Sequence, residues 1–96
     1  MKMFKVTANK GFHVTFDNGH TVSVQFGAGN YCENYNLSVL DYIDSPVPPS
    51  RTAELASWDA NGKWHEFEDG DTVFAHATSA EVLAFLNQVS SKVGGN

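Results

Sequence analysis

The sequence predicts an α+β domain: an antiparallel sheet of about five or six short strands built from hairpins, with one C-terminal helix packed on a face. Three observations carry this prediction. Apolar and polar residues alternate on both sides of a turn within 12–26, which is typical of a half-buried β-hairpin. Two more apolar segments flank a second turn at 59–63. Near the C-terminus, apolar residues at helical spacing follow a capping signal. The 96 residues fit a single domain, 1–96.

The turn of the first hairpin is predicted from the faces that its residues would occupy. A two-residue Asn18-Gly19 loop would place apolar Phe16 opposite polar Thr21. A three-residue loop that begins at Asp17, with Gly19 left-handed, instead pairs Phe16 with the residue after the glycine. One face then collects Phe12, Val14, Phe16, Val22, Val24 and Phe26. The other collects His13, Thr15, Thr21, Ser23 and Gln25.

The remaining segments of the first 50 residues are predicted from local composition. Alternation at 3–8 indicates a first strand, and the glycine- and asparagine-rich stretch 27–36 indicates a loop. The segment 37–43 fits either a short strand or about two helical turns. Three prolines within 44–50 remove hydrogen-bond donors and favour an extended connector at an edge or the surface.

A second hairpin is predicted around 59–63. A three-residue loop there sets Trp58 opposite Trp64, while Leu55 faces Phe67 on the other side. Both faces of this hairpin would be apolar, so it is either central or hidden by another chain. Tryptophan is enriched at interfaces, so the two tryptophans predict a homo-oligomer interface. Core packing of the two rings is the alternative.

A last strand at 72–77 leads into the C-terminal helix. Thr78 is the predicted N-cap, with Glu81 completing a capping box, and Gly94-Gly95 ends the helix. One buried stripe is expected to contain Val82, Phe85, Leu86, Val89 and Val93.

Composition and charge exclude several classes of partner. Eleven acidic residues against six basic ones give a net charge of −5. Binding to nucleic acid or to an anionic membrane surface requires clustered basic residues. Those of this chain are scattered: Lys2, Lys5, Lys10, Arg51, Lys63 and Lys92. We therefore expect neither nucleic acid nor a membrane as a partner.

The single cysteine, Cys32, excludes an internal disulfide framework. The chain has no segment typical of a signal peptide, and no apolar run approaches the ~20 residues of a membrane span. These features predict a soluble protein of the reducing cytoplasm.

The loop at 27–35 is the best candidate for a binding site. Its glycines allow backbone N–H groups to approach an anion, its tyrosines can stack on a base, and one arginine can grip phosphate in a bidentate fork. The predicted ligand-binding residues are Gly27, Gly29, Asn30, Tyr31, Tyr35 and Arg51. The pattern is neither a dinucleotide fingerprint nor a P-loop. The alternative is a wide connection whose tyrosines pack on the sheet edge.

The sequence contains no recognisable catalytic or metal-binding constellation, and we expect no cofactor. The four histidines, His13, His20, His65 and His76, lack the spacing of metal ligands. The acidic residues at 66–71 do not match a calcium loop and read as a solvated turn. Cys32 reads as a small packing residue rather than a nucleophile.

Three stretches of the chain, 11–35, 52–73 and 79–89, resemble small accessory proteins encoded by bacteriophages and prophages. The resemblance lies in overall pattern and covers most of the chain. It implies a compact protein in the cytoplasm of a bacterial host, where it acts on host machinery. One such class blocks immunity by sequestering a nucleotide second messenger at oligomer interfaces, and another inhibits a host protein directly.

The sequence and the resemblance together predict a non-enzymatic binding protein. Its most concrete form is an anti-defence protein that sequesters a nucleotide-like immune signal. The first alternative is an inhibitor that binds a host protein through an acidic and aromatic surface. The second is a small hydrolase or phosphodiesterase, which would need a histidine or carboxylate pair assembled by the strands.

Overall fold

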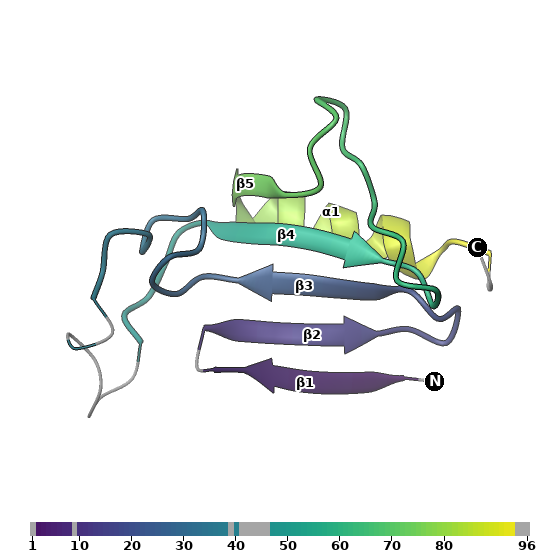
Figure 1. Ribbon diagram of the computed structural model, residues 1–96, viewed down its shortest axis with the longest axis horizontal. Helices are drawn as coiled ribbons and strands as arrows, with labels where there is room; N and C mark the ends of the chain where they lie inside the picture. Colours follow the sequence, from purple (N-terminus) through teal and green to yellow (C-terminus); the bar gives the residue numbers. More distant parts are fainter. Residues whose placement is uncertain (1, 9, 39, 41–46, 94–96) are drawn as a thin grey trace.

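The computed structural model describes residues 2–8, 10–38, 40 and 47–93. They form one antiparallel sheet in the order β1-β2-β3-β4-β5, followed by a single helix, which confirms the predicted α+β class (Figure 1). The elements are β1 (Met3–Thr7), β2 (Gly11–Thr15), β3 (Thr21–Gln25), β4 (Ala53–Trp58), β5 (Phe74–Ala77) and α1 (Ser79–Ser90). The predictions for Gly94-Gly95 and for most of 37–43 lie outside the described residues.

The first hairpin, β2–β3, has the register that its sequence predicts. Val14 pairs with Val22, and the backbone N–H of Phe16 donates to the carbonyl of His20 at 2.9 Å. Gly19 has a φ of 86°, the left-handed conformation that a three-residue loop requires. The predicted three-residue turn, which places the apolar residues of the hairpin on one face, is confirmed.

The second hairpin differs from its prediction. Trp58 does pair with Trp64, but only as an isolated bridge. The chain then leaves the sheet, and Leu55 lies opposite Phe74 of β5 instead of Phe67. The free edge of β4 can pair with only one further strand, and that strand is β5 instead of the segment 64–67. Phe67 instead packs on the core from above, with its ring 5.5 Å from that of Phe74.

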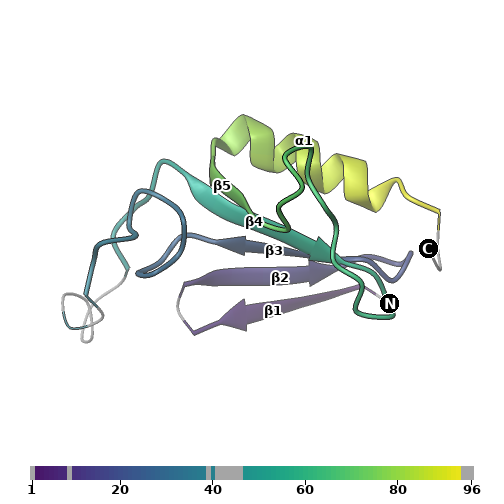
Figure 2. The same cartoon turned by 45° about the horizontal axis from the view of Figure 1, so that its top comes forward.

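The helix lies across the β3–β5 half of one sheet face and leaves β1 and β2 uncovered (Figure 2). It begins as predicted, because Thr78 and Glu81 form a reciprocal capping box. Phe85 and Val89 are buried, but Val93 is 74% exposed, so the predicted stripe ends one turn early. Val93 follows α1, whose last residue is Ser90, so it no longer shares the helical period.

The core forms between α1 and the helix-facing side of the sheet. Its buried members are Val14, Val22, Val24, Ala53, Leu55, Ala77, Phe85 and Val89. Phe12, Phe16 and Phe26 pack around this cluster and are partly buried, which agrees with the apolar face predicted for the first hairpin. Beyond the reach of α1, Phe4 and Val6 of β1 are 78% and 75% exposed.

The β2–β3 turn is fastened to the end of α1 by one side chain. The Asn18 amide donates to the carbonyls of Val89 at 2.8 Å and Lys92 at 3.1 Å. Its oxygen accepts the backbone N–H of His20 at 3.0 Å. Helix C-termini carry unpaired carbonyls, and here a distant turn supplies their donor. The sequence shows Asn18 only as a turn residue.

The edge strand β5 contains a bulge with a left-handed residue. Ala75 and His76 both lie opposite Glu54, and His76 has a φ of 54°. Its backbone N–H donates to the carbonyl of Tyr31 at 2.9 Å, so the bulge anchors the 27–37 loop.

Relieving the strained conformation of His76 is expected to stabilise the fold. The left-handed region costs a residue with a Cβ about 1–2 kcal/mol, so His76→Gly should raise the free energy of unfolding by about 0.5–1 kcal/mol. Ala75→Gly is the matched control and should lower it by about 0.5–1 kcal/mol. Urea denaturation followed by circular dichroism measures both. Equal losses in the two variants would contradict this assignment of strain.

Candidate functional site

The backbone N–H groups of the predicted ligand residues in the 27–35 loop donate hydrogen bonds within the protein. Gly27 N–H donates to the side-chain oxygen of Asn30, and Gly29 N–H to the carbonyl of Tyr35, both at 3.0 Å. Tyr31 N–H donates to a carboxylate oxygen of Glu54 at 2.9 Å. A phosphate would have to displace these bonds, because each N–H carries a single proton.

The two tyrosines of this loop stack on each other. The ring centroids of Tyr31 and Tyr35 lie 5.5 Å apart with an interplanar angle of 8°. Both side chains are about half exposed, at 51% and 44%. Each ring therefore covers part of one face of the other, and a planar ligand would have to stack on an outer face.

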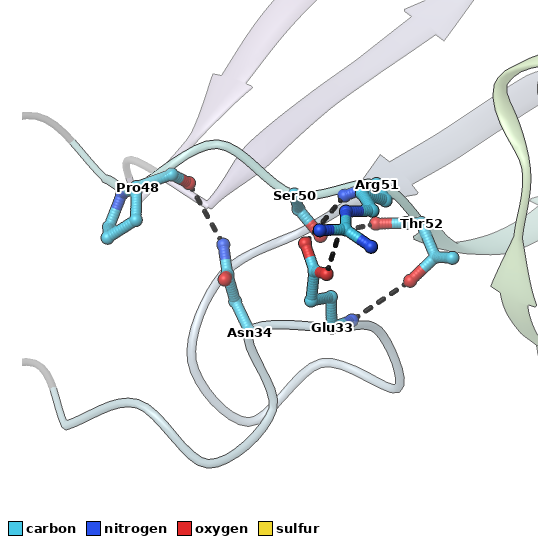
Figure 3. Close-up of polar contacts among 6 residues, drawn as sticks. All are labelled: Glu33, Asn34, Pro48, Ser50, Arg51 and Thr52. Atoms are coloured by element: carbon cyan, nitrogen blue, oxygen red, sulfur yellow. Dashed lines mark hydrogen bonds and ion pairs between the residues drawn. The ribbon is translucent and has the colours of Figure 1, made fainter.

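The predicted cation is paired with a carboxylate. Arg51 Nε lies 3.5 Å from a Glu33 oxygen, and the other Glu33 oxygen accepts the Arg51 backbone N–H at 2.9 Å (Figure 3). The same figure shows the Asn34 amide donating to the Pro48 carbonyl at 3.0 Å. These contacts fasten the loop to the segment that precedes β4. The structure thus gives all six predicted ligand residues internal contacts, and ligand binding there stays a prediction.

The two tryptophans pack against each other at the end of β4. The ring centroids of Trp58 and Trp64 are 4.9 Å apart, and His13 contacts Trp58 edge-on at 5.1 Å. His13 pairs with Ser23 in the β2–β3 register, so it lies on the face predicted to be polar. Trp64 is 47% exposed, so part of its surface is open to a partner. The homo-oligomer stays a prediction.

Cys32, the residue weighed as a nucleophile, is a buried residue of the 27–35 loop. Cys32 is 1% exposed and its thiol donates to the Gly27 carbonyl at 3.7 Å, which fits a packing role. Within the described ranges, the structure assembles no group of three or more histidine, cysteine, aspartate or glutamate residues that could hold a metal ion.

A cleft that the sequence did not reveal lies between α1 and the segment 65–69, with a volume of about 680 Å³. We call it the acidic cleft. Its apolar wall is an aromatic cluster: the Phe67 ring lies 5.2 Å from that of Phe85, and His65 contacts both. Its acidic lining residues are Glu66, Glu68, Asp69 and Glu81. The other lining residues are Leu55, Phe74, Ala84 and Gln88.

The carboxylates of the acidic cleft differ in their availability. Glu81 accepts the Thr78 N–H in the capping box, and Asp69 accepts the Asp71 N–H, both at 2.9 Å. In the described part of the chain, Glu66 and Glu68 have neither a hydrogen bond nor an ion pair from their side chains. No lysine or arginine lines the cleft. The cleft therefore presents negative charge beside aromatic rings, and Glu66 also lines a neighbouring cavity that contains Lys63 and Lys92.

His65, which lines the acidic cleft, is expected to make the free energy of unfolding depend on pH. Partial burial lowers its pKa below 6.5, and the nearby Lys92 charge lowers this pKa further. The unfolded state then binds the proton first as pH falls, so the free energy of unfolding should decrease below pH 6.5. His65→Gln should make this decrease shallower in urea titrations carried out from pH 8 to about pH 5. An unchanged slope would contradict the role of His65.

Sequence patterns missed the acidic cleft because its walls are distant in the chain. The 66–71 acidic residues did read as a turn, and Phe67 N–H donates to the Asp71 carbonyl there. Nothing local in the sequence places this turn against the exposed side of α1. The sequence does contain two acidic features that meet in the cleft: the acidic segment 66–71, and Glu81 in the first turn of the helix.

Comparisons of the chain with protein-family models, curated proteins and solved structures found no significant match. No helix in the described part of the chain is long and apolar enough to cross a membrane.

Proposed function

We propose that this protein is a non-catalytic binding protein that holds a basic, partly apolar segment of a partner protein in the acidic cleft. One observation carries the proposal: four carboxylates and an aromatic wall line the same cleft, and no lysine or arginine lines it. The proposal keeps the predicted alternative of binding through an acidic and aromatic surface, but its aromatic part is Phe67 and Phe85 instead of Trp58 and Trp64.

The chemistry of the cleft suits arginine or lysine side chains. Their charged groups can pair with Glu66 and Glu68, while their aliphatic stems cover the ring of Phe67. A cation over an aromatic face adds about 0.5–1 kcal/mol at an exposed site. Neither glutamate has to give up an internal partner, so binding breaks no bond within the protein.

Size and charge favour a peptide segment over a single small cation. The volume of about 680 Å³ falls in the range of about 300–1,000 Å³ that is typical of binding pockets. The cleft is also lined by α1 from Glu81 to Gln88. A net charge of −5 steers a basic partner toward the protein over long range.

The resemblance to phage proteins extends the proposal to a biological setting. In that setting the partner is a host protein, the site of action is the host cytoplasm, and binding inhibits the partner. Sequestration of a nucleotide-like signal is the less favoured form, because backbone N–H groups of the 27–35 loop already donate hydrogen bonds within the protein.

A fluorescence anisotropy titration tests the proposed function. The probe is a labelled hexapeptide of alternating arginine and leucine, and the control is the same peptide with glutamate in place of arginine. We expect saturable binding of the basic peptide that weakens as salt is added, since surface charges are screened within about 10 Å at 0.1 M salt. Equal binding of both peptides, or of neither, would exclude the proposal.

A further inference from the structure

The helix α1 covers only part of the sheet. In the described part of the chain, no helix lies over β1 and β2 on the core-facing side of the sheet (Figure 2). Phe4 and Val6 pair with Val14 and Phe12, so their side chains lie on this side. They are 78% and 75% exposed, and the ring of Phe4 lies 6.4 Å from that of Phe12. We call this surface, formed by Phe4, Val6 and Phe12, the open half of the sheet.

The outer surface of α1 lacks the polar character of a solvent-exposed helix. Ala80, Leu83 and Asn87 are three and four residues apart, so they share a face that is separate from the buried stripe. All three are exposed, and Leu83 is 61% exposed. Glu81 is the only charged residue within α1, and its carboxylate lies in the capping box. Surface helices normally carry charged residues opposite the core, whereas helices that are apolar on most sides are buried on most sides.

Each of these two surfaces supplies what the other lacks. An apolar sheet surface is normally covered by a helix or a second sheet, and α1 has an apolar surface left over. The 12 residues of α1 make it about 18 Å long, and the five residues of β1 and of β2 span about 17 Å. Within one chain the two surfaces cannot meet, because α1 packs on β3, β4 and β5. A second copy of the chain brings a second α1 to the open half, and twofold symmetry makes this contact occur twice.

The distribution of charge favours this arrangement over other pairings of two copies. Residues 1–26, which include β1 and β2, carry three lysines and one aspartate. Residues 27–96, which include α1, carry three basic and ten acidic residues. Placing α1 of one copy on the open half of the other therefore brings opposite net charges together. Pairing of two β1 edges would instead bring like charges together, including Lys5 of each copy.

We propose that the protein forms a twofold-symmetric dimer in which α1 of each copy packs on the open half of the other copy. The two helices then lie side by side between the two sheets. Phe4, Val6 and Leu83 become buried in this dimer, and none of the three lines the acidic cleft. The dimer is independent of the proposed function, and its interface is separate from the Trp58–Trp64 pair.

Sedimentation velocity of the purified protein, from about 1 to 300 µM, tests this dimer. At the highest concentration we expect twice the mass of one chain. Val6→Glu and Leu83→Gln should each raise the dimer dissociation constant about tenfold or more, because each variant removes an apolar contact that the symmetry repeats. Circular dichroism checks that each variant keeps the fold, which we expect because both positions are exposed.

Val93→Glu is the matched control. Val93 is 74% exposed, almost the same as Val6, but it follows the end of α1. It should change the dissociation constant by no more than about twofold. The mass of a single chain at about 300 µM would overturn the proposal. Equal weakening by Val6→Glu and Val93→Glu would also overturn it, because it would show a general charge effect.

Two further outcomes would place a dimer elsewhere and overturn the proposal. A dimer that Val6→Glu weakens but Leu83→Gln does not would pair through the β1 edges. A dimer that neither variant weakens would use another surface, such as the one that carries Trp64, which is 47% exposed.

Discussion

Replacing Glu66 and Glu68 with lysine is expected to abolish most of the binding of a basic segment to the acidic cleft. Reversal converts two attractive contacts into two repulsive ones, at a cost of about 2–3 kcal/mol, or roughly 30- to 150-fold in affinity. Both side chains are exposed and have no partner within the described structure. The fold should therefore change in stability by less than about 0.5 kcal/mol.

The matched control places the same change of charge outside the cleft. Asp17→Lys combined with Glu33→Lys removes exposed ion pairs with Lys2 and Arg51, whose contributions are small, together with the hydrogen bond that Glu33 accepts from the Arg51 backbone N–H. In the anisotropy assay this control should lose no more than about threefold, through weaker long-range steering. If both double variants lose affinity equally, net charge rather than the cleft governs binding.

Asn18→Asp is expected to produce the largest loss of stability from a near-isosteric change. Aspartate keeps the oxygen that accepts the His20 N–H, but it cannot donate to the carbonyls of Val89 and Lys92. Its negative charge also faces the negative end of α1. Together, the lost bonds and the repulsion should lower the free energy of unfolding by about 2–4 kcal/mol at pH 7.

Asn61→Asp provides the matched control, because Asn61 also precedes a glycine with positive φ but lies in an exposed turn. Its effect should stay within about 0.5 kcal/mol. Urea denaturation at pH 7 compares the two variants. A second measurement below about pH 4 should recover part of the Asn18→Asp loss, because a protonated carboxyl group can donate again. Equal stability of the two variants would show that the turn does not cap α1.

The sequence determines the local parts of this fold. Of the two turn lengths compared, only the three-residue loop puts Val14 and Val22 on the same face, so the register of β2–β3 follows from the pattern. Thr78 and Glu81 are three residues apart, and the capping box needs no distant partner. In both cases the interacting groups are close in the chain.

Choices between distant partners are the part that the sequence leaves open. Phe67 and Phe74 are both apolar and both follow β4 closely, so the pattern alone does not show which pairs with Leu55. Likewise, Asn18 occupies a standard turn position whether or not its amide reaches α1. The acidic cleft depends on both of these contacts, because they position α1 and segment 65–69. It could not be predicted before the topology was known.

The same limit applies to the predicted ligand loop. Glycine and asparagine permit backbone N–H groups to converge on an anion, but they equally permit the loop to bond to itself. Here the Asn30 side chain and the Tyr35 carbonyl accept the N–H groups of Gly27 and Gly29. Composition does not distinguish these outcomes.

The most direct test of the acidic cleft is a two-dimensional NMR titration of ¹⁵N-labelled protein with the arginine–leucine hexapeptide. The proposed function predicts that the backbone shifts concentrate on residues 65–69 and on the face of α1 that carries Ala84 and Gln88. Shifts that concentrate on the 27–35 loop or on β1, with the cleft unchanged, would contradict it.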